Sequence, residues 1–185
     1  SVVFSGQPIV NGSESLPYGN SGLSAYAETK TIAEREILEA DESQELQTIA
    51  LRPHLIWGEG DPHLLPRVIN RHKKGRLRIV GEGRNTVDLT HVDNVVHAHI
   101  CAMESMVNNT SLGGKAYFIG QDEPVNLWDW LNKIFMMLDL PGLTKKIPNH
   151  EKNLRDFSVN DGQFAFDVVS FGDEYIIGRS RSSFM

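Results

Sequence analysis

Residues 24–58, SAYAETKTIAEREILEADESQELQTIALRPHLIWG, decide the fold class. Ser24 is a suitable N-cap for a helix over residues 25–40, a segment rich in strong helix formers. Residues 48–51 form an apolar stretch without alternation, which is typical of a strand buried on both faces, and Pro53 ends it. A helix followed by such a strand predicts an α/β protein with a parallel sheet.

Strands and helices continue to alternate along the chain. Apolar patterns predict short strands at residues 2–4, 76–80, 86–92 and 116–119. Caps and apolar spacing predict three further helices. The first is capped by Asp61 and ends at Gly75; the second is capped by Asp93 and carries Val96, Ile100, Met103 and Met106; the third opens at Asn126 and carries Leu127, Trp128, Leu131, Phe135 and Leu138.

The overall composition excludes several classes of function. The chain has 185 residues, a formal charge of −6 and one cysteine, Cys101. The negative charge argues against a general binder of nucleic acid or of anionic membranes, because both would repel it. A single cysteine excludes an internal disulfide and fits a reducing compartment, so we expect a cytoplasmic protein. No apolar run reaches the roughly 20 residues that span a bilayer.

Tyr26 and Lys30 carry the sharpest chemical signal. A spacing of four residues on a helix places the phenol beside the ammonium group. A neighbouring positive charge favours the phenolate, so the pair can exchange a proton with a substrate oxygen while hydride moves to or from a nicotinamide. Tyrosine and lysine also meet at this spacing by chance, so the pair needs the support of its neighbours.

The order of motifs around the pair supplies that support. Residues 51–58 read LRPHLIWG, and GEG at 81–83 precedes LTHVDNVV at 89–96. This order resembles the extended short-chain dehydrogenases, in which a YxxxK helix leads into a strand ending in LRP-x-x-(I/V)-(Y/W)-G and a GDG turn precedes an FVHVDDVA segment. The resemblance covers residues 1–148 and implies a Rossmann-type parallel sheet, part of a small substrate-binding domain, and NAD or NADP as cofactor.

Three longer segments are similar to the 3β-hydroxysteroid dehydrogenase branch of that family. They are residues 1–18, 50–69 and 90–106, and they resemble sterol 4-carboxylate 3-dehydrogenases and, even more, bacterial 2-alkyl-3-oxoalkanoate reductases. Nucleotide-sugar epimerases usually carry an arginine, which grips the substrate's diphosphate, at the position of Val87. Because valine cannot pair with phosphate, the resemblance implies an apolar small-molecule substrate.

The resemblance also implies roles for individual residues. Tyr26 would be the general acid/base, and Lys30 would hold the ribose hydroxyls of the nicotinamide. His54 and Trp57 would either face the substrate or serve packing, and both readings stay open. The backbone of three consecutive residues would line the nicotinamide: Pro53, His54 and Leu55.

Other expected parts of the family pattern are missing. The sequence contains no GxGxxG or GxxGxxG turn, which in this family meets the pyrophosphate at a helix N-terminus. The family's catalytic serine or threonine would fall just before Ser1. We therefore expect a C-terminal fragment whose full-length parent could form a homodimer. Residues 1–58 would belong to the dinucleotide-binding domain, 59–148 would mix substrate-binding segments with returning Rossmann strands, and 149–185 would be a tail without assigned structure.

The remaining candidate sites have ordinary explanations. His97 and His99 lie two apart on a predicted helix and point to different sides, so with His91 they predict no metal site. The basic run 71–78 is expected to complement the dipole at a helix C-terminus rather than to bind phosphate. Cys101 is expected to be a small core residue.

Three hypotheses follow. The first is an NAD(P)-dependent oxidoreductase that interconverts a 3-hydroxyl and a 3-keto group on a steroid or a long-chain β-keto acid. The second is a nucleotide-sugar epimerase or dehydratase. The third is an inactive or partner-dependent fragment, which titration with NADH would separate from the first.

Overall fold

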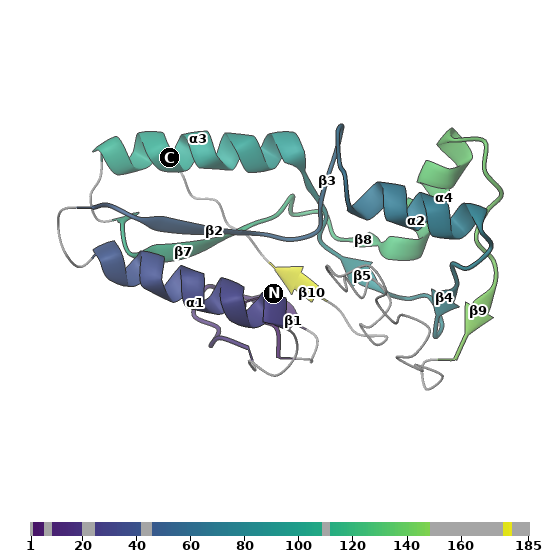
Figure 1. The fold of residues 1–185 in the computed structure, drawn as a ribbon, viewed down its shortest axis with the longest axis horizontal. Helices are drawn as coiled ribbons and strands as arrows, with labels where there is room; N and C mark the ends of the chain where they lie inside the picture. Colours follow the sequence, from purple (N-terminus) through teal and green to yellow (C-terminus); the bar gives the residue numbers. More distant parts are fainter. Residues whose placement is uncertain are drawn as a thin grey trace.

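Two helices cover the two faces of a parallel strand pair in one lobe of the molecule (Figure 1). α1 (Ala25–Ala40) and α3 (Val92–Asn108) lie on opposite sides of β2 (Ile49–Pro53) and β7 (Lys115–Ile119). β2 and β7 pair in parallel, residue for residue, along their whole length. This computed structural model describes residues 2–5, 9–19, 25–41, 46–108, 112–148 and 176–178. The predicted α/β class with parallel strands is confirmed.

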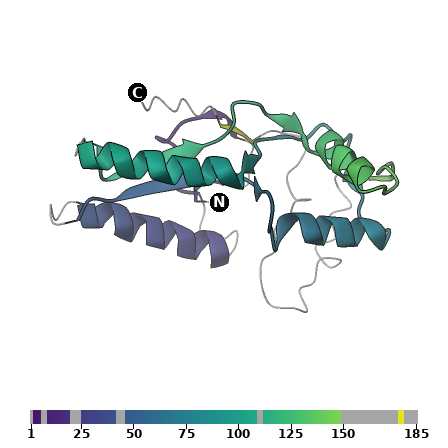
Figure 2. The ribbon, with the colours of Figure 1, turned by 90° about the horizontal axis from the view of Figure 1, so that it is seen from above.

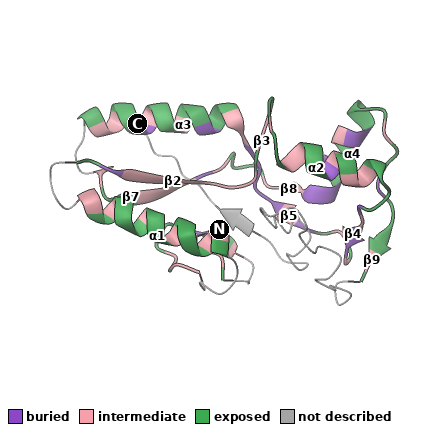
Figure 3. Cartoon of the chain, viewed as in Figure 1, coloured by how far each residue is buried: buried purple, intermediate pink, exposed green. Residues whose placement is uncertain are grey.

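The second lobe contains the main hydrophobic core. It lies beyond the carboxyl ends of β2 and β7, as both views show (Figure 1, Figure 2). Four of the apolar residues predicted for the third helix are buried in this core, namely Leu127, Trp128, Leu131 and Phe135, whereas Leu138 is exposed. Figure 3 shows buried segments on that helix. Its elements are β3 (Ile56–Trp57), α2 (Leu64–Lys73), β4 (Ile79–Val80), β5 (Thr86–Val87), β6 (Thr90–His91), β8 (Val125–Asn126), α4 (Leu127–Met137) and β9 (Lys146–Ile147).

Short strand pairs hold this second lobe together. β3 pairs with β6, and β4 pairs with β9, both in parallel. β5 pairs antiparallel with β8. The strand predicted over residues 86–92 is therefore two short strands, and the one predicted over 76–80 is only two residues long. These predictions were wrong in extent because strand length depends on pairing partners that a single sequence does not reveal.

α1 has the predicted bounds and packs through one face. Ala27, Thr31, Glu34 and Leu38 are half-buried, whereas Ile37 is exposed. Lys30, Ala33 and Ile37, which share one face of the helix with Tyr26, are exposed. Ser24, its predicted N-cap, lies outside the described residues.

α3 packs on a face other than the expected one. Val95 and Ala102 are buried, while Val96, Ile100 and Met103 are exposed. The helix begins at Val92, so Asp93 lies in its first turn instead of capping it. The Nδ1 atom of His91 accepts the Asp93 N–H at 3.3 Å and takes the capping role.

α2 and α4 are capped as the sequence indicates, with one shift. The Asp61 carboxylate accepts the N–H groups of His63, Leu64 and Leu65 at 2.8, 3.0 and 2.7 Å, although the helix itself starts at Leu64. Burial acts to raise the pKa of Asp61, but these three donors outweigh it and lower that pKa. The last turn of α2 carries Arg71, His72 and Lys73, as expected from the basic run, and Gly75 with φ of +63° follows it.

Asn126 caps α4 and accepts the N–H groups of Trp128 and Asp129.

The two ends of the chain differ from the sequence expectations. Val2–Phe4 forms a turn instead of a strand, and the Val2 carbonyl accepts the Gly19 N–H at 2.8 Å. β1 (Ile9–Gly12) lies in the segment expected to be a loop. β10 (Ile176–Gly178) lies in the tail, for which no element was expected, and it pairs in parallel with β1 and β5. Among the described residues, no helix combines the length and the apolar character needed to cross a bilayer.

Candidate functional site

The first turn of α1 lies at the carboxyl edge of the strand pair. α1 runs opposite to β2, so its start, with Tyr26 and Lys30, is at the end of the lobe where β2 finishes and the chain turns toward β3 (Figure 1). In open α/β sheets, ligands bind beyond the carboxyl ends of the strands. The structure therefore brings the predicted catalytic pair and the predicted nicotinamide-lining turn to the same edge.

Tyr26 and Lys30 are neighbours on the helix surface. The Lys30 Nζ atom lies 5.8 Å from the centroid of the Tyr26 ring. Tyr26 is half-buried and Lys30 is exposed. The ammonium group thus lies over the Tyr26 ring, and it remains accessible to a ligand at the same edge.

The turn after β2 is held in an unusual backbone conformation. Leu55 has φ of +41°, which is uncommon for a residue other than glycine. Its side chain packs against the core of the second lobe, and its carbonyl accepts the Thr90 N–H at 3.3 Å. These contacts fix the path of residues 53–55 between the two lobes.

His54 is held by the second lobe. Its Nδ1 atom lies 2.9 Å from the carbonyl oxygen of Asp88, which places a proton on Nδ1 as the donor. Burial of the ring lowers the pKa of His54 to about 4, even though the bond to Asp88 acts to raise it. The imidazole is therefore neutral at pH 7, and its contact with the Asp88 carbonyl favours the packing alternative for His54.

Trp57 belongs to an aromatic cluster. Its ring meets His91 edge-on at 4.8 Å between centroids and Trp130 edge-on at 5.3 Å. The indole Nε1 atom is covered and has no hydrogen-bond partner within the described part of the chain. These contacts favour packing for Trp57, the second of the two alternatives that the sequence leaves open.

An ion pair that the sequence did not reveal fastens α1 to β2. The Arg52 Nη2 atom lies 2.6 Å from Glu34 Oε1, and both side chains are only 9% exposed. The Arg52 Nε atom also donates to the Glu34 carboxylate at 3.1 Å. An arginine inside an apolar strand was the available signal, since a buried cation needs a partner. This pair sets how α1, and with it Tyr26, sits on the sheet.

The histidines predicted not to bind metal have other contacts. His99 Nδ1 lies 2.7 Å from the Val95 carbonyl, and His97 Nε2 lies 3.4 Å from the Cys101 sulfur. No group of three potential metal ligands occurs among the described residues. Cys101 is half-buried on α3 and therefore is not the core residue expected.

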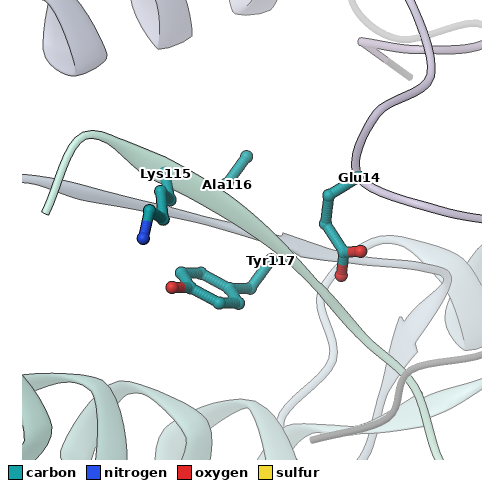
Figure 4. Close-up of a pocket in the computed structure, with 4 residues that line it drawn as sticks. All are labelled: Glu14, Lys115, Ala116 and Tyr117. Carbon is teal, nitrogen blue, oxygen red and sulfur yellow. The ribbon is translucent and has the colours of Figure 1, made fainter. Parts of the chain in front are cut away.

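A pocket of about 390 Å³ lies on β7, away from these residues (Figure 4). Glu14, Lys115, Ala116 and Tyr117 line it. The Glu14 carboxylate also accepts the Phe118 N–H at 3.0 Å and thereby covers part of the free edge of the strand. None of the predicted site residues lines this pocket.

The sequence profile of the 3-beta hydroxysteroid dehydrogenase/isomerase family matches residues 1–148. The chain belongs to this family. Sterol-4-alpha-carboxylate 3-dehydrogenase from Bos taurus is 44% identical over 152 residues, which cover 81% of this chain and 41% of that enzyme. The 2-alkyl-3-oxoalkanoate reductase of Shewanella oneidensis is 43% identical over 155 residues, with 80% and 40% covered. The chain spans about two fifths of the length of these relatives.

Solved structures show the same fold at lower sequence identity. A nucleoside-diphosphate-sugar epimerase from Pseudomonas aeruginosa superposes with a TM-score of 0.64 at 18% identity, over 94% of this chain and 55% of that one. UDP-glucuronic acid 4-epimerase from Bacillus cereus, solved in complex with NAD, gives 0.64 at 21% identity, over 80% and 48%. At these identities the likeness concerns the Rossmann-type fold. Val87, at the position where the sequence comparison placed the arginine of nucleotide-sugar epimerases, is buried in the core of the second lobe.

Proposed function

We propose that this chain carries the proton-transfer residues of an NAD(P)-dependent oxidoreductase. The enzyme would interconvert a 3-hydroxyl and a 3-keto group on a steroid or a long-chain β-keto acid. The observation that supports this most strongly is the Tyr26–Lys30 pair, with Nζ 5.8 Å from the phenol ring at the carboxyl edge of β2. The relatives with 43–44% identity are named as a dehydrogenase and a reductase, which agrees with this chemistry.

The residues at this edge fit the nicotinamide end of a dinucleotide. Lys30 is exposed, and its ammonium group can donate hydrogen bonds to ribose hydroxyls. The turn at residues 53–55 presents its backbone at the same edge and is held rigidly by its contacts with the second lobe. No glycine-rich phosphate turn occurs in the sequence, so residues beyond this chain would have to hold the pyrophosphate.

Tyr26 would transfer the proton. In the reducing direction its phenol donates a proton to the carbonyl oxygen of the substrate, and in the oxidising direction its phenolate accepts one from the hydroxyl. Lys30 stabilises the negative charge that the phenol oxygen acquires. When bound, the nicotinamide supplies or accepts the hydride. His54, neutral and bonded to the Asp88 carbonyl, would shape the site without exchanging protons.

The wider assignment is part of the same proposal. Residues 1–58 would complete the dinucleotide-binding domain and 59–148 would supply substrate-binding segments together with returning strands. The substrate would be an apolar small molecule. The single, unpaired Cys101 supports a reducing, cytoplasmic location. Val96, Ile100 and Met103 are exposed along one side of α3, which supports a homodimer of the full-length protein.

A substrate panel tests the proposal. The full-length protein that carries these residues would be assayed by NADH and NADPH absorbance with a 3β-hydroxysteroid 4-carboxylate and a 2-alkyl-3-oxoalkanoate. A UDP-sugar would be assayed by chromatography of its products, because epimerisation and dehydration consume no net NADH. We expect turnover of one of the two apolar classes. Turnover of the UDP-sugar alone would contradict the proposal in favour of an epimerase. The isolated 185-residue chain would be titrated with NADH in parallel, and we expect weak binding because the phosphate turn is missing.

A further inference from the structure

A dense basic run lies at one end of the second lobe. Residues 67–78 contain six lysine and arginine residues and no acidic residue. Lys73, Lys74 and Arg76 are exposed. Cations in the last turn of α2 complement its dipole, but the run continues past the end of the helix. The helix dipole of α2 therefore accounts for only part of this basic run.

Three consecutive apolar side chains project from the same end of the molecule. Met136 and Met137 are 70% and 81% exposed, and Leu138 is 48% exposed. Phe135, directly before them, is fully buried, so the chain leaves the core abruptly at this point. We call Met136, Met137 and Leu138 the α4 tip. Lys133, one turn earlier on the same side of the helix, is exposed as well.

Specific contacts hold the basic run beside the α4 tip. The His72 ring stacks on Phe135 with centroids 3.9 Å apart, and His72 Nε2 lies 2.6 Å from the Pro141 carbonyl. The Ile79 N–H donates to the Lys145 carbonyl at 2.9 Å, at the start of the β4–β9 pair. The segment from residue 72 to residue 79 is therefore fixed at both ends to the chain that follows the α4 tip.

We propose that this end of the molecule docks on a membrane surface that contains anionic phospholipids. Lys73, Lys74 and Arg76 would lie at the headgroups, and the α4 tip would insert into the interface. A few inserted apolar side chains next to a basic cluster are the combination that gives reversible interfacial binding. The proposal does not depend on the reaction that the protein catalyses.

The shape of the α4 tip favours a lipid surface over an acidic protein. A helical peptide partner needs a groove that receives apolar anchors one turn apart. At the α4 tip, Met136 and Met137 are consecutive and 70% and 81% exposed, so they stand out from the surface next to each other and not one turn apart. Side chains that project from a helix end suit insertion between lipids better than insertion into a groove.

The net negative charge of the chain does not prevent docking on an anionic membrane, because the charged residues are unevenly distributed. The formal charge of −6 is not spread evenly over the molecule. The acidic residues of the other lobe would face away from the membrane, while the basic run faces it, so local attraction survives an overall repulsion. Residues 25–41 contain two cations and five acids: Glu28, Glu34, Glu36, Glu39 and Asp41.

Vesicle flotation tests the proposal with the 185-residue chain. Vesicles of phosphatidylcholine alone and of phosphatidylcholine with phosphatidylserine would be compared at low and high salt. The charge variant is Lys73→Gln/Lys74→Gln/Arg76→Gln, and the apolar variant is Met136→Ser/Met137→Ser. A matched control, Val10→Ser/Leu46→Ser, removes two exposed apolar side chains from outside the second lobe. Circular dichroism would establish that each variant retains the fold.

We expect salt-sensitive binding to the phosphatidylserine vesicles only. The charge variant should bind about a hundredfold more weakly and the apolar variant at least about tenfold more weakly, while the control binds like the parent. Equal binding to both kinds of vesicle, or tip variants that bind like the control, would overturn the proposal. Capture of the chain by immobilised polyglutamate without any binding to vesicles would also overturn it, in favour of an acidic protein partner.

Discussion

At the scale of single residues, His54 shows how the second lobe holds the turn that follows β2. Its Nδ1–H group donates a hydrogen bond to the carbonyl of Asp88, 34 positions later in the chain, and burial lowers the pKa of His54 to about 4. An unfolded histidine titrates near pH 6.5. Below that pH the unfolded chain takes up a proton that the folded chain resists, so acidification favours unfolding.

The stability of the fold should therefore depend on His54 in mildly acidic solution. The contribution of this residue is fully present above about pH 6.5 and is lost as the pH falls toward 4, by about 3 kcal/mol at most. Urea unfolding at several pH values would measure it. His54→Asn keeps an amide donor for the Asp88 carbonyl and should flatten the pH dependence, whereas His97→Asn, at an exposed position, should not. Equal pH dependence in both variants would show that His54 is not the responsible group.

At the scale of elements, the sequence predicted helix bounds and caps correctly, but it did not predict which helix faces pack against the rest of the chain. The bounds of α1, the cap at Asn126 and the glycine after α2 depend on neighbours within a few residues. The faces that α1 and α3 bury depend on residues elsewhere in the chain. Apolar periodicity predicted a stripe on α3, but the structure covers a different side of that helix. The Glu34–Arg52 pair was not predicted for the same reason, because the two residues are 18 positions apart and lie on different elements.

The Glu34–Arg52 pair should be a main contribution to the docking of α1 on β2. Glu34→Gln leaves a buried guanidinium without its counter-charge, so we expect the free energy of unfolding to fall by about 3 kcal/mol. Glu82→Gln removes the exposed partner of Lys146, 3.9 Å away, and should change it by less than about 1 kcal/mol. Denaturant unfolding of the two variants compares a buried with an exposed pair directly. Equal losses would mean that the buried pair does not fasten α1.

At the scale of the whole molecule, the core is unevenly distributed. The cluster of buried side chains lies in the second lobe, while the lobe that carries Tyr26 exposes apolar residues on both of its helices. The parallel direction in which β2 and β7 pair agrees with the predicted fold class, whereas the identity of the two partners came from the structure. The two-lobe division of the core did not, because it arises from contacts between segments as distant as residues 68 and 143.

The exposed stripe on α3 should cause self-association of the 185-residue chain. Val96, Ile100, Met103 and Val107 lie along one side of that helix and are all exposed. Sedimentation velocity at micromolar concentration should show species larger than the monomer. Val96→Glu/Ile100→Glu should shift the distribution toward monomer, and Glu104→Gln on the same helix should leave it unchanged. A parent chain that sediments as a monomer would contradict this expectation.

The central claim is that Tyr26 transfers the proton in the reaction of this family member. The most direct measurement is the turnover number of Tyr26→Phe in the full-length protein with its preferred apolar substrate. Tyr117→Phe, which removes a tyrosine hydroxyl from the pocket on β7, is the matched control. We predict that Tyr26→Phe lowers kcat by at least about a hundredfold, while Tyr117→Phe stays close to the parent value. Unchanged kcat in Tyr26→Phe would contradict the account.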